Sequence, residues 1–290
     1  MTSKFLKALG FGAALAASLA LAPAAFAKDW KTVVVGMEGA YEPWNLTDSS
    51  GKIVGFEPDL VMDLCKRAGF ECKIIAQDWD GMIPGLKAGK FDVIMDGMSI
   101  TDERKQAIDF SKPYASTPGG FAGLKSGPLA KLPGTGSTVI LTGDAVHDKP
   151  TIDALRVALT GKKIGIQTAT SFTKFVEDNF GDVATITEYK TAPEHDLDVT
   201  GGRVDVAFDD ITYFVSAFAK PGNREMVVVG PQIAGPIWGE GEGAGFRKSD
   251  TDLHAMFDKA LAAAIADGTL KKLSLKWFKL DVTPVAASRS

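Results

Sequence analysis

A short segment, residues 99–104, carries the groups best suited to binding an anion. Ser99 offers a hydroxyl donor, and Thr101 stands three residues before Arg104, a spacing typical of a helix N-cap. Backbone N–H groups left free at a helix start favour an anion, and the planar guanidinium of Arg104 can hold a carboxylate through two parallel hydrogen bonds. Together they predict a receptor for a small carboxylate, whereas Arg104 alone would be interpreted as a solvated surface arginine.

Buried strands must position this segment. Residues 91–95 form an apolar, partly β-branched run, which predicts a strand that breaks at Gly97. Residues 31–36 predict a first strand of the same kind, and Glu38 and Tyr41 follow its carboxyl end. Ligands collect at that end of the strands in open α/β sheets. Glu38 and Tyr41 are therefore candidate ligand contacts, with ordinary loop surface as the alternative interpretation.

The second half of the chain repeats this arrangement. Residues 202–210 share with residues 89–96 a glycine, a basic residue and an apolar run that ends on an acid, here Asp209 and Asp210. The repeat predicts an α/β protein with two lobes of like construction, each ending a strand on an acid at the cleft.

A second turn suited to an anion follows the strand predicted at residues 162–167. It contains Thr170 and Ser171 before a helical pattern. Hydroxyls at the end of a strand and the start of a helix can bind an anion or simply cap the helix, and one hydroxyl can do both.

The first 27 residues have the order of a secretory signal, with two lysines, an apolar run and a small-residue Ala-x-Ala site, and cleavage is predicted after Ala27. A membrane anchor is disfavoured because the apolar run is short for a membrane span. The 32 basic residues, less Lys4 and Lys7, leave 30 against 36 acidic ones. This acidic balance argues against nucleic acid or an anionic membrane as a partner.

Residues 92–104 (Asp-Val-Ile-Met-Asp-Gly-Met-Ser-Ile-Thr-Asp-Glu-Arg) and 109–114 (Asp-Phe-Ser-Lys-Pro-Tyr) resemble the signature of periplasmic polar amino-acid binding proteins of ABC importers, solute-binding protein family 3. The likeness is strongest to the lysine/arginine/ornithine, histidine and opine-binding group, and it covers nearly the whole chain after residue 30. It implies the type II periplasmic binding protein fold, with two lobes of mixed sheet and flanking helices joined by two hinge strands. It also implies a monomer in the periplasm and an inner-membrane ABC permease as partner.

The resemblance implies a role for each candidate site residue. Arg104 and Ser99 would hold the ligand α-carboxylate from one lobe, and Thr170 and Ser171 from the other. Asp210 would pair with the α-ammonium, and Glu38, aided by Asp96, would bind a positive charge at the far end. Tyr41 and Trp79 would stack along the ligand side chain. The full predicted set is Glu38, Tyr41, Trp79, Asp96, Gly97, Ser99, Arg104, Thr170, Ser171 and Asp210. The chain departs from the family pattern at Asp96 and Asp209, where neutral residues are common, and at Ala169, where glycine is common.

Cys65 and Cys72 are the only cysteines. Two cysteines at short separation in an exported chain predict a disulfide, with two buried free thiols as the alternative. Some histidine and basic amino-acid binders carry a disulfide at this place, which the resemblance adds in support. The three histidines, His147, His195 and His254, are dispersed and expected at the surface, so neither a metal site nor a cofactor is predicted.

The expected organisation is a signal peptide at residues 1–27, a first part of lobe 1 at 28–116, lobe 2 at 117–230, a return hinge with the second part of lobe 1 at 231–282, and a disordered tail at 283–290. Lobe 2 contains an insertion at about residues 124–160 that is rich in Gly, Pro, Ser and Thr, with one helix expected at 152–159. A similar insertion occurs in the opine-binding relatives that the chain resembles.

The predicted function is capture of a cationic L-amino acid (arginine, lysine, ornithine or histidine) by closure of the lobes and its delivery to the permease. An opine such as octopine or nopaline is the alternative ligand. An enzyme similar to cyclohexadienyl dehydratase shares the fold, but no Ser/His/Asp nucleophile pattern is present and no catalytic residue is predicted. Presentation of the ligand to a chemoreceptor is a third possibility.

Overall fold

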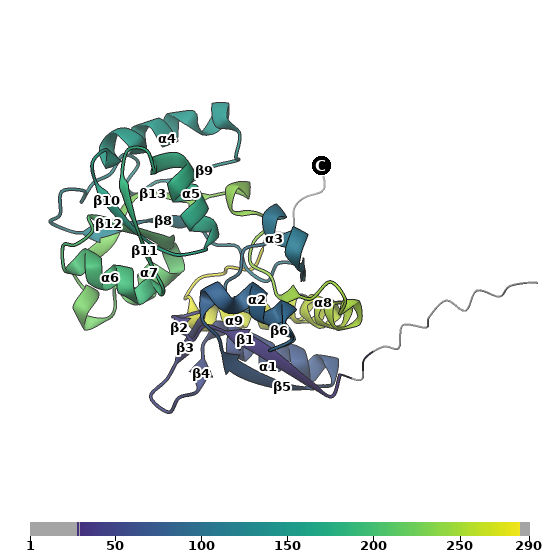
Figure 1. Ribbon diagram of the computed structural model, residues 1–290. Helices are drawn as coiled ribbons and strands as arrows, with labels where there is room; N and C mark the ends of the chain where they lie inside the picture. The colour runs from purple at the N-terminus through teal and green to yellow at the C-terminus, as the bar shows by residue number, and fades with distance from the viewer. Residues whose placement is uncertain (1–27, 29, 285–290) are drawn as a thin grey trace, which may run out of the picture.

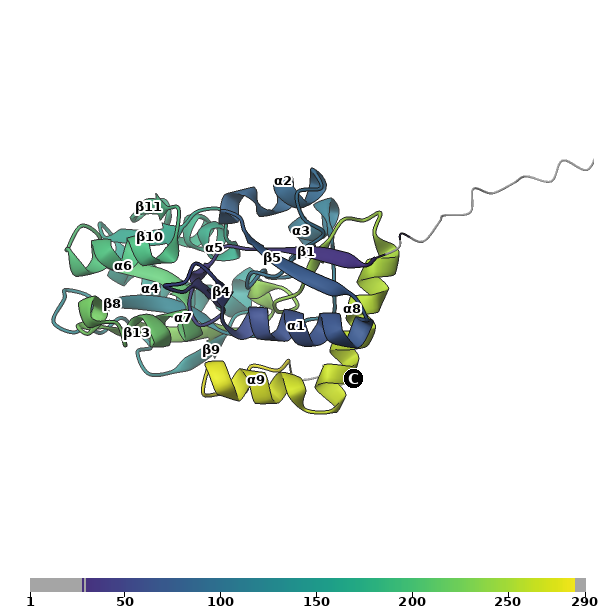
Figure 2. The same cartoon turned by 90° about the horizontal axis from the view of Figure 1, so that it is seen from below.

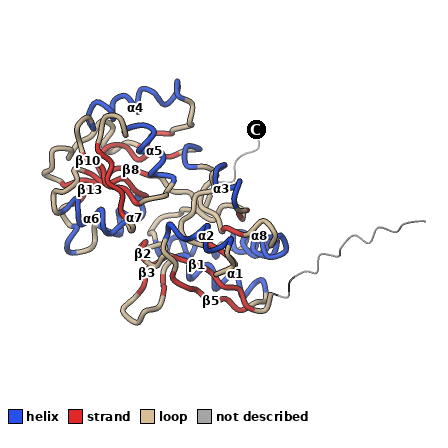
Figure 3. The backbone as a smooth tube through the Cα atoms, viewed as in Figure 1, coloured by secondary structure: helices blue, strands red, loops and turns tan. Residues whose placement is uncertain are grey.

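The structure is a computed structural model, and it describes residue 28 and residues 30–284. The expected signal peptide and most of the expected tail lie outside the described residues. Figure 1 shows two lobes: the strands from the start of the chain and the helices from its end share one lobe, and the middle of the chain forms the other. Each lobe has a sheet with helices packed around it (Figure 3).

Lobe 1 is built on a five-stranded sheet in the order β5-β1-β6-β14-β7, with a small three-stranded sheet, β2-β3-β4, beside it. β1 pairs in parallel with β5 and β6, whereas β14 runs antiparallel to β6 and β7. Its elements are β1 (Thr32–Met37), β2 (Ala40–Tyr41), β3 (Asn45–Thr47), β4 (Ile53–Val54), α1 (Phe56–Ala68), β5 (Glu71–Ala76), η1 (Trp79–Gly81), α2 (Met82–Lys87), β6 (Val93–Ile94), α3 (Asp102–Ala107), β7 (Asp109–Phe110), β14 (Gly245–Phe246), α8 (Thr251–Ala266) and α9 (Thr269–Trp277).

The two faces of the lobe 1 sheet carry separate apolar cores. On one face, Val33 and Val35 of β1 pack with α1, α8 and α9, and Figure 2 shows these three helices on the same side of β1 and β5. On the other face, Phe91 and Met98 pack with α2. Because alternate residues of β1 face opposite sides, the strand is held between helices and its carboxyl end is fixed at the cleft.

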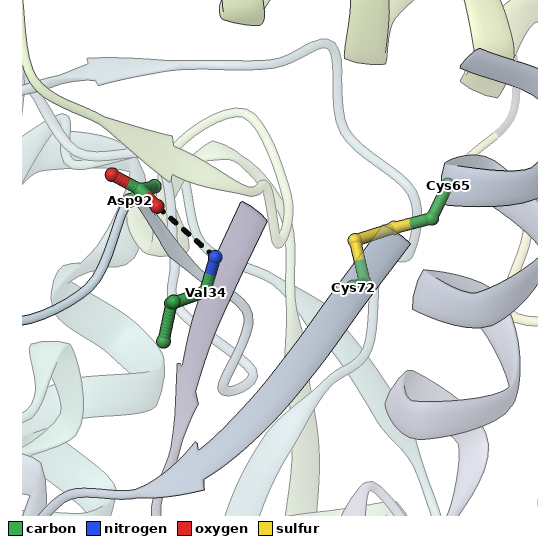
Figure 4. The surroundings of a disulfide bond; sticks show 4 residues. All are labelled: Val34, Cys65, Cys72 and Asp92. Atoms are coloured by element: carbon green, nitrogen blue, oxygen red, sulfur yellow. Dashed lines mark hydrogen bonds between the residues drawn. A yellow bond between two sulfur atoms is a disulfide. The ribbon is translucent and has the colours of Figure 1, made fainter. Parts of the chain in front are cut away.

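The predicted disulfide is confirmed. Cys65 near the end of α1 is bonded to Cys72 in β5, with Gly69 in a left-handed conformation between them (φ 84°) that ends the helix. Figure 4 shows the bond beside β1, where the Val34 backbone N–H donates to Asp92 Oδ2 at 3.0 Å. The bond ties the helix to the edge strand of the sheet.

Lobe 2 is built on a six-stranded sheet in the order β11-β10-β12-β8-β13-β9. β10 pairs in parallel with β11 and β12, and β8 runs antiparallel between β12 and β13. Its elements are β8 (Gly119–Leu124), β9 (Thr138–Ile140), α4 (Ala145–Leu159), β10 (Lys163–Gln167), α5 (Ser171–Phe180), β11 (Thr185–Tyr189), α6 (Ala192–Thr200), β12 (Val206–Asp210), α7 (Ile211–Ala217), η2 (Pro221–Asn223), β13 (Met226–Ala234) and η3 (Pro236–Trp238).

The insertion is an ordered part of lobe 2. Its helix, α4, is longer than the expected helix at residues 152–159, because the Asp144 side chain caps it by accepting from the backbone N–H groups of Val146 and His147, and the helix continues through Pro150. Leu155 and other insertion leucines are buried in the lobe 2 core, namely Leu129, Leu132, Leu141 and Leu159. The insertion therefore enlarges that core.

Two chain crossings join the lobes, one between β7 and β8 and one between β13 and β14. They meet where Glu242 forms isolated bridges with Ser99 and Ala115. β13 pairs within lobe 2 as far as Ala234, four residues beyond the boundary expected at residue 230, because an irregularity between Val229 and Ile233 bends the strand without ending it. Among the described helices, none has the length and apolar character needed to cross a membrane.

Candidate functional site

A cavity lies between the lobes, with about 350 Å³ of space counting the part open to solvent. Nine of the ten predicted ligand-binding residues line it, and Asp210 does not. The lining residues are Glu38, Tyr41, Trp79, Asp96, Gly97, Ser99, Arg104, Gln167, Thr170, Ser171 and Phe172. Both lobes contribute, so the shape of the cavity depends on lobe closure.

One end of the cavity holds the Arg104 guanidinium. Nη1 donates to the backbone oxygen of Ser99 at 3.1 Å, and Nη2 donates to the backbone oxygen of Ala169, in the other lobe, at 3.3 Å. The Trp79 ring lies 5.3 Å from the guanidinium carbon. Burial lowers the pKa of Arg104 to about 10, so the group stays charged near neutral pH. No carboxylate of the described residues forms an ion pair with it, and the cation is available to an anionic ligand.

Hydroxyls from both lobes surround the same end. The predicted cap is confirmed, because Thr101 Oγ1 accepts from the Arg104 backbone N–H at 3.2 Å and so places this side chain at the cleft. In the other lobe, Thr170 caps α5 by accepting from the Thr173 backbone N–H at 3.0 Å. The Ser99 and Ser171 hydroxyls lie 3.1 Å apart across the cleft. This end therefore offers a cation and several hydroxyl donors.

Two acidic side chains, Glu38 and Asp96, also line the cavity. Asp96 Oδ1 accepts from the Glu38 backbone N–H at 2.9 Å and from Asn45 Nδ2 at 2.8 Å, whereas its buried Oδ2 has no partner among the described residues. Burial raises the pKa of Asp96 well above its usual range, and the charges of Glu38 and Glu57 raise it further. Burial also raises the pKa of Glu38 to about 7, although the hydrogen bond from Gln167 opposes this. A cation here would offset the cost of these buried charges.

Three predicted residues make contacts that compete with, or add to, ligand contact. Tyr41 donates its hydroxyl to Asp209 Oδ1 at 2.5 Å and stacks on Tyr213 with ring centres 5.0 Å apart, so it joins the lobes as well as lining the cavity. The Gly97 backbone N–H donates to Glu57 Oε1 at 2.7 Å and is already used within lobe 1. Trp79 packs against the arginine, as described above.

Asp210 is the predicted residue that the structure places apart from the cavity lining. It caps α7, where its Oδ1 accepts from the Thr212 backbone N–H at 2.6 Å, and its Oδ2 accepts from the Thr117 hydroxyl. Burial raises the pKa of Asp210 to about 6 in spite of these donors. Pairing of Asp210 with a ligand ammonium stays a prediction.

The surface position expected for His195 is wrong. The side chain is fully buried, with Nε2 3.0 Å from Asp209 Oδ2 and Nδ1 3.1 Å from Asp196 Oδ1. Burial alone would lower the pKa of His195, but the two carboxylates outweigh it and raise the pKa to about 9. The histidinium thus lies directly behind the aspartate that Tyr41 contacts.

Gln167 and Phe172 line the cavity but were not among the predicted residues. They flank the small-residue turn before α5, and this position was the only feature of the sequence that could have indicated a place in the cavity lining. The residues that the structure describes include no cluster of three or more histidine, cysteine or acidic side chains able to hold a metal ion.

The family is decided by comparison with known sequences. Residues 33–280 match the profile of the bacterial extracellular solute-binding proteins, family 3. The chain belongs to this family. An octopine-binding periplasmic protein of Rhizobium meliloti is 40% identical to this solute-binding protein over 272 residues, which cover 88% of the chain and 92% of the relative. An L-arginine-binding protein of Pseudomonas aeruginosa is 32% identical, covering 96% and 98%.

A solved structure confirms the predicted fold. It is that of a periplasmic His/Glu/Gln/Arg/opine family-binding protein from Silicibacter pomeroyi in complex with lysine, 34% identical, with a TM-score of 0.70 over 87% of this chain and 99% of that one. The solute-binding protein therefore has the type II periplasmic binding protein fold, with two mixed α/β lobes. The relatives named here are binding proteins, in agreement with the prediction of a binder and not an enzyme.

Proposed function

We propose that this solute-binding protein captures a basic amino acid, or an opine built on one, in the periplasm and delivers it to an ABC permease of the inner membrane. The first candidates are arginine, lysine, ornithine and histidine. Arg104, with the hydroxyls of Ser99 and Ser171, holds the ligand carboxylate, and Glu38 with Asp96 binds the cation of the side chain.

One observation carries this proposal: the same cavity is lined by the Arg104 guanidinium and by the carboxyls of Glu38 and Asp96, and none of the three forms an ion pair with another described residue. Opposite charges in a poorly hydrated cleft attract much more strongly than on a surface. A ligand with a carboxylate and a distant cation satisfies both kinds of group at once, whereas glutamate would place an anion beside Glu38.

Lobe closure follows from the same geometry. Because Arg104 and Glu38 belong to lobe 1 and Ser171 to lobe 2, a bound ligand contacts both lobes only in the closed state. A ligand that binds one state more tightly shifts the equilibrium toward that state. The closed form is then the one presented to the permease.

An opine is the second candidate, and two observations favour it. The octopine-binding relative is 40% identical to this chain. A wider groove also adjoins the cavity at Arg104 and Ser171 and includes Lys174 in its lining. Octopine carries an extra carboxylate on an arginine skeleton, and the groove offers space on that side, although Lys174 is already paired with Asp178 (Nζ to Oδ2, 2.7 Å).

Calorimetric titration tests the proposal. The mature protein is unfolded and refolded to remove carried ligand, then titrated with the four basic amino acids, octopine, nopaline, glutamine and glutamate. We expect dissociation constants of about 1 μM or tighter for at least one cationic ligand and much weaker binding of glutamate. No binding across the cationic ligands and opines would overturn the proposal.

A further inference from the structure

Gln167, at the end of β10 in lobe 2, reaches across the cleft to the acidic side chains that line the cavity. Its Nε2 donates to Glu38 Oε1 at 2.9 Å and to the backbone oxygen of Lys190 at 3.1 Å. The side chain lines the cavity, although the residue is only 4% exposed. An amide at this place adds a polar group without adding charge.

The hydrogen bonds of Gln167 determine which way its amide faces. Both N–H groups point at acceptors, one carboxylate oxygen and one backbone carbonyl. The reversed amide would set Oε1 against two acceptors, an arrangement with no compensating donor. Oε1 is therefore the amide atom left for a ligand, and no described residue donates to it.

Three acceptor groups thus meet in one part of the cavity: the Gln167 carbonyl, the Glu38 carboxyl and the Asp96 carboxyl. Asp96 Oδ2 is buried without a partner in the described part of the chain, and Glu38 uses only Oε1 toward Gln167. The two carboxyls supply only negative charge. The amide oxygen adds a directional acceptor, which discriminates between ligands by the number and placement of their N–H donors.

We propose that Gln167 is a specificity-determining residue that selects a guanidinium over a primary ammonium, so that arginine and arginine-based opines bind more tightly than lysine and ornithine. A guanidinium presents five N–H donors in one rigid plane, and it can serve all three acceptors together. An ammonium is a compact charge with three donors, which the two carboxyls satisfy. This inference rests on the proposed function, because it specifies the ligand of the same cavity.

Gln167→Met is the variant that tests the inference, because it keeps the length of the side chain and removes the amide. We expect arginine affinity to fall about tenfold or more, the effect of losing one hydrogen bond to a charged group. Lysine affinity should fall less than arginine affinity, because lysine loses only the support that the Gln167–Glu38 bond gives to closure, and retained lysine binding shows that the variant is folded and closes. Gln232→Met makes the same change at a glutamine of β13 that does not line the cavity; it is the matched control and should leave the arginine-to-lysine ratio unaltered.

A ligand-side measurement keeps the test independent of any folding defect. In the wild-type protein, monomethylation of a terminal arginine nitrogen removes an N–H donor but keeps the charge, and should weaken binding by about tenfold. An unchanged arginine-to-lysine ratio in Gln167→Met, or a wild-type preference for lysine, overturns the inference while the proposed function stands. If the wild-type protein binds no cationic ligand, both the inference and the proposed function are overturned.

Discussion

Tyr41 of lobe 1 and Asp209 of lobe 2 are joined by a hydrogen bond of 2.5 Å across the cleft. Asp209 is held from behind by the buried His195, and Tyr41 is held by its stack on Tyr213. Trp44 makes a second contact of this kind, since its Nε1 donates to the Thr212 hydroxyl at 3.1 Å. Closure is thus stabilised by protein contacts as well as by ligand.

Tyr41→Phe should weaken ligand binding about three- to tenfold, because it removes the hydroxyl that links the lobes while keeping the stacked ring. The open form loses nothing by the change, so the closed population falls. Calorimetric titration measures the affinity. Tyr213→Phe is the matched control: its hydroxyl donates to Asp196 within lobe 2 at 2.7 Å. It should lower thermal stability and leave affinity nearly unchanged. Equal affinities for wild type and Tyr41→Phe would contradict the role of this bond in closure.

Arg104→Ala should abolish measurable binding, by a factor of about 100 or more, because the carboxylate end loses its cation. The affinity of Arg104→Lys should lie between those of the wild type and Arg104→Ala, since an ammonium keeps the charge but not the planar arrangement of donors. Titration gives the affinities, and a melting curve checks that the fold persists. Wild-type affinity in Arg104→Ala would remove the central claim of the proposed function.

Binding of a cationic ligand should be coupled to proton release from Glu38. Burial raises its pKa to about 7, above the ordinary value, so part of the population is protonated near pH 7. A bound cation favours the carboxylate, so affinity should rise as pH increases through about 7 and fall in acid. Titrations in buffers of different ionisation enthalpy measure the proton count.

Glu38→Gln supplies the control for this coupling. It should remove most of the proton release and weaken cationic ligands far more than neutral ones such as glutamine. An equal loss for both kinds of ligand would mean that Glu38 supports the fold and does not bind the charge.

The parts of the site that could be predicted from the sequence are local ones. Thr101 and Thr170 cap the helices that follow them, and the strand ends bring Glu38 and Arg104 to one cleft. Residues near each of them in the sequence are sufficient to predict these positions. Where the position of a residue depends on partners far away in the sequence, local sequence patterns did not predict it. The helix expected at residues 152–159 is longer in the structure and contains Pro150, and the side chain of Gln167 is positioned by Glu38 in the other lobe.

His195 shows the same limit most clearly, because its burial depends on Asp209, which lies in another element. Its pKa, raised to about 9, gives a testable consequence. A histidine with a raised folded-state pKa contributes stability that is complete below its unfolded pKa, about 6.5, and is lost as pH rises through the folded value. The wild-type protein should therefore lose stability between about pH 6.5 and 9.

His195→Gln separates this effect from that of the buried carboxyls, whose raised pKa values also lower stability as pH rises. The variant should be less stable than wild type at about pH 6, because Asp196 and Asp209 lose their cation, and the difference should shrink by about pH 10. Denaturant unfolding at several pH values measures it. A difference that stays constant with pH would show that the histidine is neutral, and Tyr41 would then face an aspartate without a charged partner.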